Sequence, residues 1–220
     1  MNKEWSELNK TMQAQLRKKD AFQAGLETLF SLRSQLMDTI LSFRNALAPA
    51  DFSAIPFINA DGYHSKTVAY SLWHIFRIED IVAHTLISGD EQIFFKGGYQ
   101  HRMNAPIITT GNELKKQQIA DFSAQLDLDA LYAYLSDVKE STEKILRGFS
   151  FEDLKRKVPD ERKAALQALH VVSEDENAIW LIDYWCGKDV RGLIQMPFSR
   201  HWIMHIEAAL RIRAKLQPAA

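Results

Sequence analysis

Prolines and glycines, the residues that most readily interrupt a helix, are scarce in this chain and gather between long helix-forming stretches. Only six prolines and nine glycines occur among 220 residues. Glycine weakens the interior of a helix, and proline removes a backbone hydrogen bond there. The chain shows no convincing strand alternation, no internal repeat and no change of composition along its length. The sequence therefore predicts a single all-α domain over residues 1–220.

Apolar residues recur every three or four positions in the expected helices, which places them on one face. Between residues 9 and 47, with Gly25 as a candidate break, this stripe consists of Leu26, Leu29, Phe30, Leu36, Ile40 and Phe43. Further helices are expected over residues 65–88, from 113 onward, 127–147, 159–172, 173–187 and 197–216. The boundary signals are Ser65 or Thr67 as an N-cap, Gly89 as a stop, and Ser173-Glu174-Asp175-Glu176 as a capping box.

Long helices joined in this way predict an antiparallel four-helix bundle. Residues 1–20 would form a helical N-terminal extension, and extra short helices would lie between Pro159 and Gly187. The segment 89–111 contains Gly97-Gly98 and Pro106, so we expect a long loop there. Loops longer than about 12–15 residues without secondary structure usually have a role beyond connection.

Composition excludes several classes of protein. The net charge is -1, with 27 basic and 28 acidic residues, so no nucleic-acid partner is expected. No apolar run approaches the roughly 20 residues that a membrane span needs. The single cysteine, Cys186, allows no intrachain disulfide and is expected to be a packed thiol. The first residues lack an apolar stretch behind a positive end, so we expect no signal peptide and a cytoplasmic protein.

Two histidines lie one turn apart on the last predicted helix. His201 and His205 are separated by about 40° around the helix axis, so both imidazoles project to the same side. Phe198, Ala208 and Ile212 share this arc, which indicates that it faces inward. Burying two imidazoles costs free energy unless each ring finds partners. A shared metal ion would supply one, and hydrogen bonds to backbone or carboxylate groups are the alternative.

His74 lies on the second predicted helix with Tyr70 and Ile78 on its arc, and a satisfied core histidine is again the alternative. Together with His201 and His205 it would give three imidazoles with a fourth position open, which is typical of reactive zinc sites. Candidate pocket residues are Tyr70, Ile78, Phe198, Arg200 and His101. The long loop could bring His101 to the pocket mouth, and Arg200 or Arg77 could orient an anion; for all three, a surface position is the alternative.

Three segments carry a family resemblance: residues 71–80 (SLWHIFRIED), 110–112 (TGN) and 196–205 (MPFSRHWIMH). In this order they resemble the bacterial DinB/YfiT-like superfamily, from about residue 20 to the end. The resemblance implies a four-helix bundle, often dimeric, with a divalent metal such as zinc or nickel bound at the positions of His74, His201 and His205. Members include S-transferases and isomerases that use low-molecular-weight thiols, and others classed as metal-dependent hydrolases. The 89–111 insertion and the helical material between Pro159 and Gly187 depart from the family pattern.

Two functional hypotheses follow. The first is a divalent-metal-dependent hydrolase or thiol S-transferase that acts on a small molecule, for which the sequence shows no general base. It contains neither a His-Glu-x-x-His motif nor a Gly-x-Ser-x-Gly elbow. The second is a non-catalytic stress-response or binding module built as a homodimeric scaffold. Its interface would use Trp202, Ile206 and Ala209 on the last helix, and packing against the chain's own core explains the same residues.

Overall fold

All regular structure among the described residues is helical, which confirms the predicted class. The computed structural model describes residues 2–217, and within them the only β-type pairing is an isolated bridge between Lys157 and Asp189. None of the described helices combines the length and the apolar character that crossing a membrane would require. The helical elements in chain order are α1 (Lys3–Gln15), α2 (Phe22–Ala46), η1 (Pro49–Ser53), η2 (Gly62–His64), α3 (Val68–Asp80), η3 (Ile81–Ser88), α4 (Ile93–Lys96), α5 (Tyr99–Arg102), α6 (Gln117–Gln125), α7 (Leu128–Arg147), η4 (Glu152–Lys155), α8 (Asp160–Ala168), α9 (Trp180–Cys186), α10 (Val190–Gln195), η5 (Met196–Arg200) and α11 (His201–Leu216).

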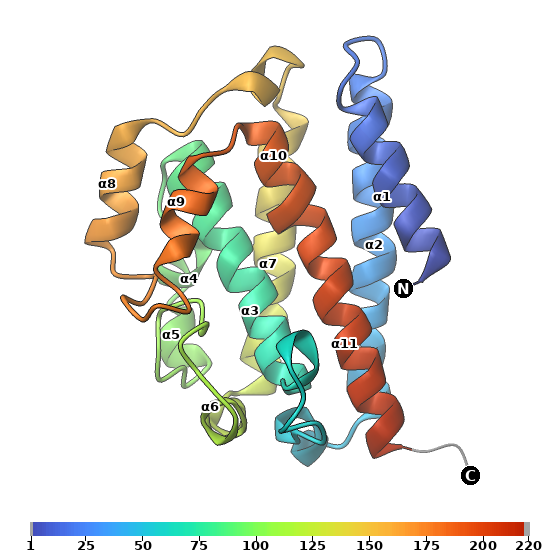
Figure 1. The fold of residues 1–220 in the computed structure, drawn as a ribbon, viewed down its shortest axis with the longest axis vertical. Coiled ribbons are helices and arrows are strands. Elements are labelled where there is room, and N and C mark those ends of the chain that lie inside the picture. The colour runs from blue at the N-terminus through green and yellow to red at the C-terminus, as the bar shows by residue number, and fades with distance from the viewer. Residues whose placement is uncertain (1, 218–220) are drawn as a thin grey trace.

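Four long helices, α2, α3, α7 and α11, pack side by side (Figure 1). α2 contacts α7, α7 contacts α3, α3 contacts α11, and α11 contacts α2. The Tyr132 hydroxyl of α7 donates to the Ile40 carbonyl of α2, whereas Arg33, earlier on α2, donates to Glu143, later on α7. α2 and α7 therefore run antiparallel.

α3 and α7 run in the same direction, so the neighbouring helices are not all antiparallel. Tyr134 on α7 donates to Asp80 at the end of α3, and Ser141, two turns further along α7, contacts His84 in the following segment η3. The connection from α3 to α7 therefore has to return along the whole length of the helices. Residues 89–127 make that return, through α4, α5 and α6 (Figure 1).

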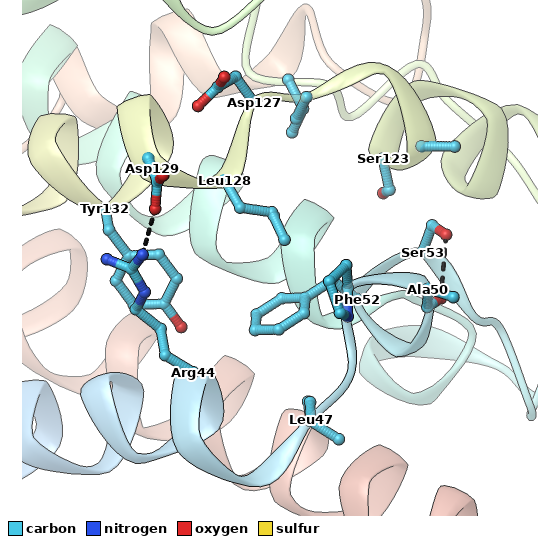
Figure 2. Close-up of a pocket in the computed structure, with 13 residues that line it drawn as sticks. Arg44, Leu47, Ala50, Phe52, Ser53, Ser123, Asp127, Leu128, Asp129 and Tyr132 are labelled. Atoms are coloured by element: carbon cyan, nitrogen blue, oxygen red, sulfur yellow. Dashed lines mark hydrogen bonds and ion pairs between the residues drawn. The ribbon is translucent and has the colours of Figure 1, made fainter.

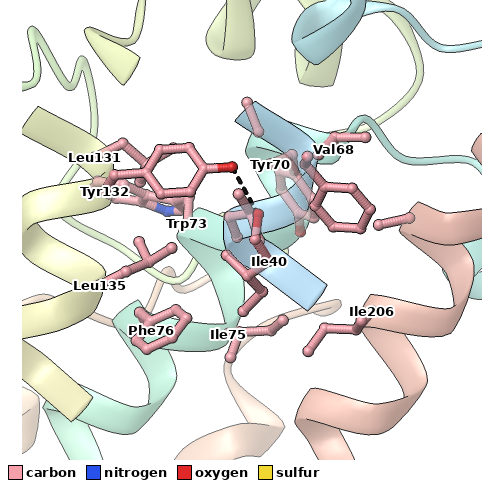
Figure 3. Packing of buried hydrophobic residues seen from close by; sticks show 14 of the residues in the cluster. Ile40, Val68, Tyr70, Trp73, Ile75, Phe76, Leu131, Tyr132, Leu135 and Ile206 are labelled. Atoms are coloured by element: carbon pink, nitrogen blue, oxygen red, sulfur yellow. Dashed lines mark hydrogen bonds between the residues drawn. The ribbon is translucent and has the colours of Figure 1, made fainter. Parts of the chain in front are cut away.

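The apolar stripes predicted from the sequence meet in the core between these helices. In Figure 3, Ile40 of α2, Trp73 and Phe76 of α3, Leu135 of α7 and Ile206 of α11 point toward one another, and all five are fully buried. Every apolar residue of the predicted α2 stripe is also buried. Burial of such side chains is the main stabilising contribution to a helical domain of this kind.

The N-terminal helical stretch breaks earlier than expected. The chain turns between α1 and α2 at residues 16–21, and Gly25 lies inside α2. A Cβ on Gly25 would lie 2.8 Å from Leu16 Cδ2 and 3.1 Å from the Leu16 backbone nitrogen. Gly25 is therefore required for the close approach of α1 to α2, and the expectation of a break or bend there is wrong.

A buried ion pair joins three of the long helices. Arg33 of α2 forms two hydrogen bonds to the Glu79 carboxylate of α3, at 2.9 and 2.7 Å, and both side chains are inaccessible to solvent. The Trp202 indole of α11 donates to the same carboxylate at 2.8 Å, and Arg33 also donates to the carbonyl of Phe198 at 3.0 Å. Hydrogen bonds to several partners, as here, are what make a buried charge pair tolerable.

The segment 89–111 is more ordered than the predicted loop, because it contains the short helices α4 and α5. Asp80 at the end of α3 accepts hydrogen bonds from the backbone nitrogens of Ile93 and Phe94, at 2.8 and 2.9 Å. Arg77 donates to the Ile108 carbonyl and is fully buried. The surface position that the sequence left open as an alternative for Arg77 is therefore wrong. The segment is therefore anchored to α3 at both of its ends.

Two helix starts differ from those predicted. Residues 173–176 form no capping box: Asp175 instead accepts a hydrogen bond from the Asn177 backbone, and α9 starts only at Trp180. The last helical stretch begins at Val190 rather than near Pro197, which lies inside the π-helical segment η5. Proline has no N–H to donate to the preceding turn, and π-helical turns are often found next to functional sites.

The apolar residues proposed as a dimer interface face the chain's own core. Trp202, Ile206 and Ala209 are completely inaccessible to solvent within a single chain. They cannot contact a second copy without unpacking the core, so that interface is excluded for these three residues. The expectation of a homodimer itself stays a prediction.

Candidate metal centre

The structure brings the three predicted metal ligands together in the core. His74 projects from α3, and His201 and His205 project from the first turns of α11. The ring centroids of His74 lie 5.0 Å from His201 and 4.8 Å from His205, and those of His201 and His205 are 4.6 Å apart. One nitrogen from each ring lies within 4.8 Å of the other two. This is close enough for a single ion to contact all three, and no other group of this kind occurs among residues 2–217.

The backbone of the 89–111 segment orients His74. The Nδ1 atom of His74 lies 2.7 Å from the carbonyl oxygen of Thr110 and donates to it, because a carbonyl only accepts. This bond assigns the proton to Nδ1 and leaves the Nε2 lone pair free. A backbone carbonyl behind the ring is the usual partner of a metal-ligating histidine.

His201 and His205 lack such partners. The Nδ1 atoms of both rings are buried without a hydrogen bond, and the described residues supply no bond to either ring. His84, another buried histidine, shows the contrast: its ring contacts Asp90 at 2.8 Å and Ser141 at 3.1 Å. His84 is therefore a core histidine whose ring has hydrogen-bond partners, and this alternative does not hold for His201 and His205. Two buried, unpartnered imidazoles beside a third fit a metal ion, whose bond would offset their loss of hydration.

Burial keeps the three imidazoles neutral. Desolvation is the main cause that lowers the pKa of His74 to about 4, although the Thr110 hydrogen bond acts in the opposite direction. Desolvation also holds the pKa values of His201 and His205 well below the ordinary value, and the neighbouring histidines lower them further. A metal ion binds the neutral imidazole, so all three rings are ready to act as ligands at neutral pH.

The histidines line the inner wall of a pocket of about 460 Å³. Lys66, Tyr70, His74 and Ile78 follow one another at intervals of four residues, so α3 and the residues before it present one stripe to the pocket. The Tyr70 ring stacks on His74 with centroids 5.4 Å apart, and its hydroxyl donates to the Gly111 carbonyl at 2.9 Å. The remaining wall comes mainly from apolar and aromatic side chains of η2, α9 and η5.

Only two of the five other candidate residues line this pocket, namely Tyr70 and Ile78. Phe198 is buried in the core behind it, and its carbonyl accepts from Arg33. Arg200 is exposed and outside the lining. His101 is exposed on α5 and borders a separate hollow beside Phe94 and Phe95, so the expectation that it reaches the pocket mouth is wrong.

Several pocket residues were missed in the sequence. Lys66 lies four residues before Tyr70, so the same periodicity that selected Tyr70 and Ile78 could have found it. Tyr63, Trp180 and Tyr184 reach the pocket from η2 and α9 through tertiary folding, and no local pattern indicates this. The partner of His74 is a backbone carbonyl, which leaves no trace in a sequence.

A second hollow, of about 600 Å³, lies between the end of α2, η1 and the start of α7 (Figure 2). Its cation, Arg44, is paired with Asp129 and lies over the ring of Tyr132, 4.8 Å from the centroid. The charged groups in this hollow are therefore already partnered, and no cluster of three metal-ligating groups occurs there among the described residues.

The comparisons with known proteins support the fold alone. No family model matches the sequence, and no curated protein matches it either. One similar solved structure is that of a conserved protein from Enterococcus faecalis, with 15% sequence identity and a TM-score of 0.56. The match covers 87% of this chain and 94% of that one. At this identity the likeness concerns the arrangement of helices and carries no function.

Proposed function

We propose that this protein is a divalent-metal-dependent enzyme of the DinB/YfiT-like type, a four-helix bundle of α2, α3, α7 and α11 that acts on a small molecule. The convergence of His74, His201 and His205, buried and largely unpartnered at the wall of a pocket of about 460 Å³, carries the proposal. Three neutral nitrogen donors with room for a further ligand suit zinc or nickel.

A divalent ion held there would lower the pKa of a bound thiol or water and polarise an electrophile. The protein's own residues prepare the site for this. The Thr110 carbonyl fixes the His74 tautomer, and the stacked Tyr70 ring fixes its plane. The apolar wall formed by Ile78, Leu181 and Pro197 limits the water around the histidines.

Within this class, the pocket favours thiol transfer over hydrolysis. A metal-dependent hydrolase usually needs a carboxylate or similar base to take the proton of the attacking water. The described residues that line the pocket include no aspartate or glutamate. The carboxylate of Glu113, which acts on Tyr70 through space, lies outside the lining and accepts from the Thr109 hydroxyl. A thiol loses its proton far more readily than water, so it can react without such a base.

The test is turnover of a defined thiol and electrophile pair. N-acetylcysteine and 1-chloro-2,4-dinitrobenzene would form a thioether, with the thiolate sulfur replacing chloride, which leaves. We expect turnover in the zinc- or nickel-loaded protein, loss of turnover on chelation or in His74→Gln, and retention in the matched core variant His84→Gln. In cobalt-substituted protein, the thiol should also produce a sulfur-to-cobalt charge-transfer band.

Three other results would count against the proposed thiol transfer. Turnover that persists after chelation would contradict a metal-dependent reaction. Hydrolysis of 4-nitrophenyl acetate by the metal-loaded protein without any thiol would instead assign the site to hydrolysis. Binding of metal without turnover of either substrate would favour the non-catalytic alternative.

A further inference from the structure

Lys66 brings an unpaired positive charge to the metal pocket. It is half-buried, and no carboxylate among residues 2–217 forms an ion pair or hydrogen bond with it. Its Nζ atom lies 4.9 Å from the centroid of the Tyr70 ring, and the same ring stacks with His74. Removing an ammonium group from water without a counter-ion costs free energy. Because Lys66 lines the same pocket as the three histidines, that pocket is suited to receive an anion.

The other groups in the pocket do not neutralise this charge. The described lining has no aspartate or glutamate, and burial holds its three histidines neutral. A divalent ion on these histidines would add two further positive charges. Positive charge without a counter-charge is costly in a partly enclosed pocket. The electrostatics therefore favour an anionic ligand over a neutral or cationic one.

Asn112 provides a second donor on the same pocket. The Thr110 hydroxyl donates to Asn112 Oδ1 at 2.7 Å, which fixes the amide so that its NH₂ group is the free end. No described residue accepts a hydrogen bond from that NH₂ group, and Asn112 lines the pocket. One ammonium and one amide match the two oxygens of a carboxylate. Sites for phosphate dianions more often use arginine forks, and no arginine is among the described residues that line this pocket.

Aromatic side chains form another part of the pocket wall. Trp180 and Tyr184 of α9 contact each other edge to face at 5.6 Å, and 50% of Trp180 remains exposed although it lines the pocket. Tyr63 of η2 is also partly exposed, and its ring lies 4.8 Å from His205. Exposed aromatic side chains grouped at a pocket usually contact the apolar part of a ligand.

We infer that the pocket binds a small carboxylate with an apolar or aromatic body, whose carboxylate is held by Lys66 and Asn112 and whose body packs against Trp180, Tyr184 and Tyr63. This inference rests on the proposed function for the reacting group at the histidines and extends it to the class of substrate. Lys66 is thus a specificity-determining residue at the end of the helical stripe that carries His74.

The probes are 4-fluorobenzoate and its neutral counterpart 4-fluorobenzamide, followed by ¹⁹F NMR on the full chain. We expect the wild type to bind the carboxylate at least about tenfold more tightly than the amide, which corresponds to about 1.4 kcal/mol. Lys66→Met should remove this preference, and Lys66→Arg should keep most of it. Lys18→Met, a change of an exposed lysine outside the pocket, should bind as the wild type does. Circular dichroism establishes that each variant is folded.

Each titration is run on zinc-loaded protein and on protein treated with a chelator, so that the two proposals can fail separately. Dependence on Lys66 in either form supports the carboxylate site, even if no metal binds. Equal affinity of the wild type for both probes would overturn it, as would unchanged carboxylate binding by folded Lys66→Met or the absence of binding by the wild type. Metal binding would be unaffected by those negative results.

Discussion

At the scale of single residues, the four buried histidines differ in what surrounds them rather than in how deeply they lie. His84 and His74 each have a hydrogen-bond partner, whereas His201 and His205 have none among the described residues. Sequence periodicity could predict that His74, His201 and His205 face inward, because each shares an arc with apolar residues. It could not predict the Thr110 carbonyl behind His74, because that contact depends on how residues 107–111 fold back onto α3.

The buried histidines give the metal-free protein a defined pH dependence. The pKa of His74 is lowered to about 4 in the folded state by desolvation, against 6.5 in an unfolded chain. The unfolded chain therefore takes up a proton first as the pH falls. This stabilising contribution is complete above pH 6.5 and is lost between pH 6.5 and 4. His201 and His205 act in the same direction.

Between pH 7 and pH 5, His74 alone should account for a loss of about 2 kcal/mol in the free energy of unfolding. Urea denaturation at the two pH values, with a chelator present, measures this loss. The difference between the two pH values should shrink by that amount in His74→Gln and stay unchanged in His101→Gln, because His101 is exposed. An identical difference in the wild type and His74→Gln would contradict the account.

At the scale of the elements, helix interiors were predictable and several helix ends were not. The stripe of α2 follows from apolar spacing, and Thr67, one of the two N-cap candidates, caps α3 through a hydrogen bond from the Tyr70 backbone. The end of α1 lies where Leu16 packs against α2, and the start of α9 follows a local turn in which Asp175 accepts from the Asn177 backbone. Glycine commonly interrupts helices. Gly25 nevertheless lies within α2, where its lack of a side chain leaves room for Leu16 of the preceding turn.

The packing at Gly25 predicts a change in stability opposite to the one that helix propensity predicts. Alanine normally stabilises a helix interior by about 1 kcal/mol relative to glycine. At Gly25 the added Cβ would meet Leu16 at 2.8 Å, so we expect Gly25→Ala to lower the free energy of unfolding by about 1–3 kcal/mol. Gly148→Ala is the matched control, since its Cβ would meet only the Ile145 carbonyl, at 3.4 Å. Equal or greater stability of Gly25→Ala in urea denaturation would show that α1 does not pack as described.

At the scale of the whole molecule, the site depends on helices that are distant in sequence. His74 lies on α3, and His201 and His205 lie on α11, at the other end of the chain. The buried pair of Arg33 and Glu79 holds α2 against α3 close to Trp202, the residue after His201. The all-α class and the inward histidines could be predicted, whereas the pocket wall from α9 could not, because it depends on the path of residues 148–189 around the long helices.

The central claim is that His74, His201 and His205 bind one metal ion. The most direct measurement is elemental analysis of the full-length protein purified without a metal-affinity tag, compared among the wild type, His201→Gln and the matched core variant His84→Gln. We predict about one divalent ion per chain in the wild type and in His84→Gln, and a sharp loss in His201→Gln. A wild type that retains no metal and takes up none measurably, or a His201→Gln variant with unchanged metal content, would contradict the account.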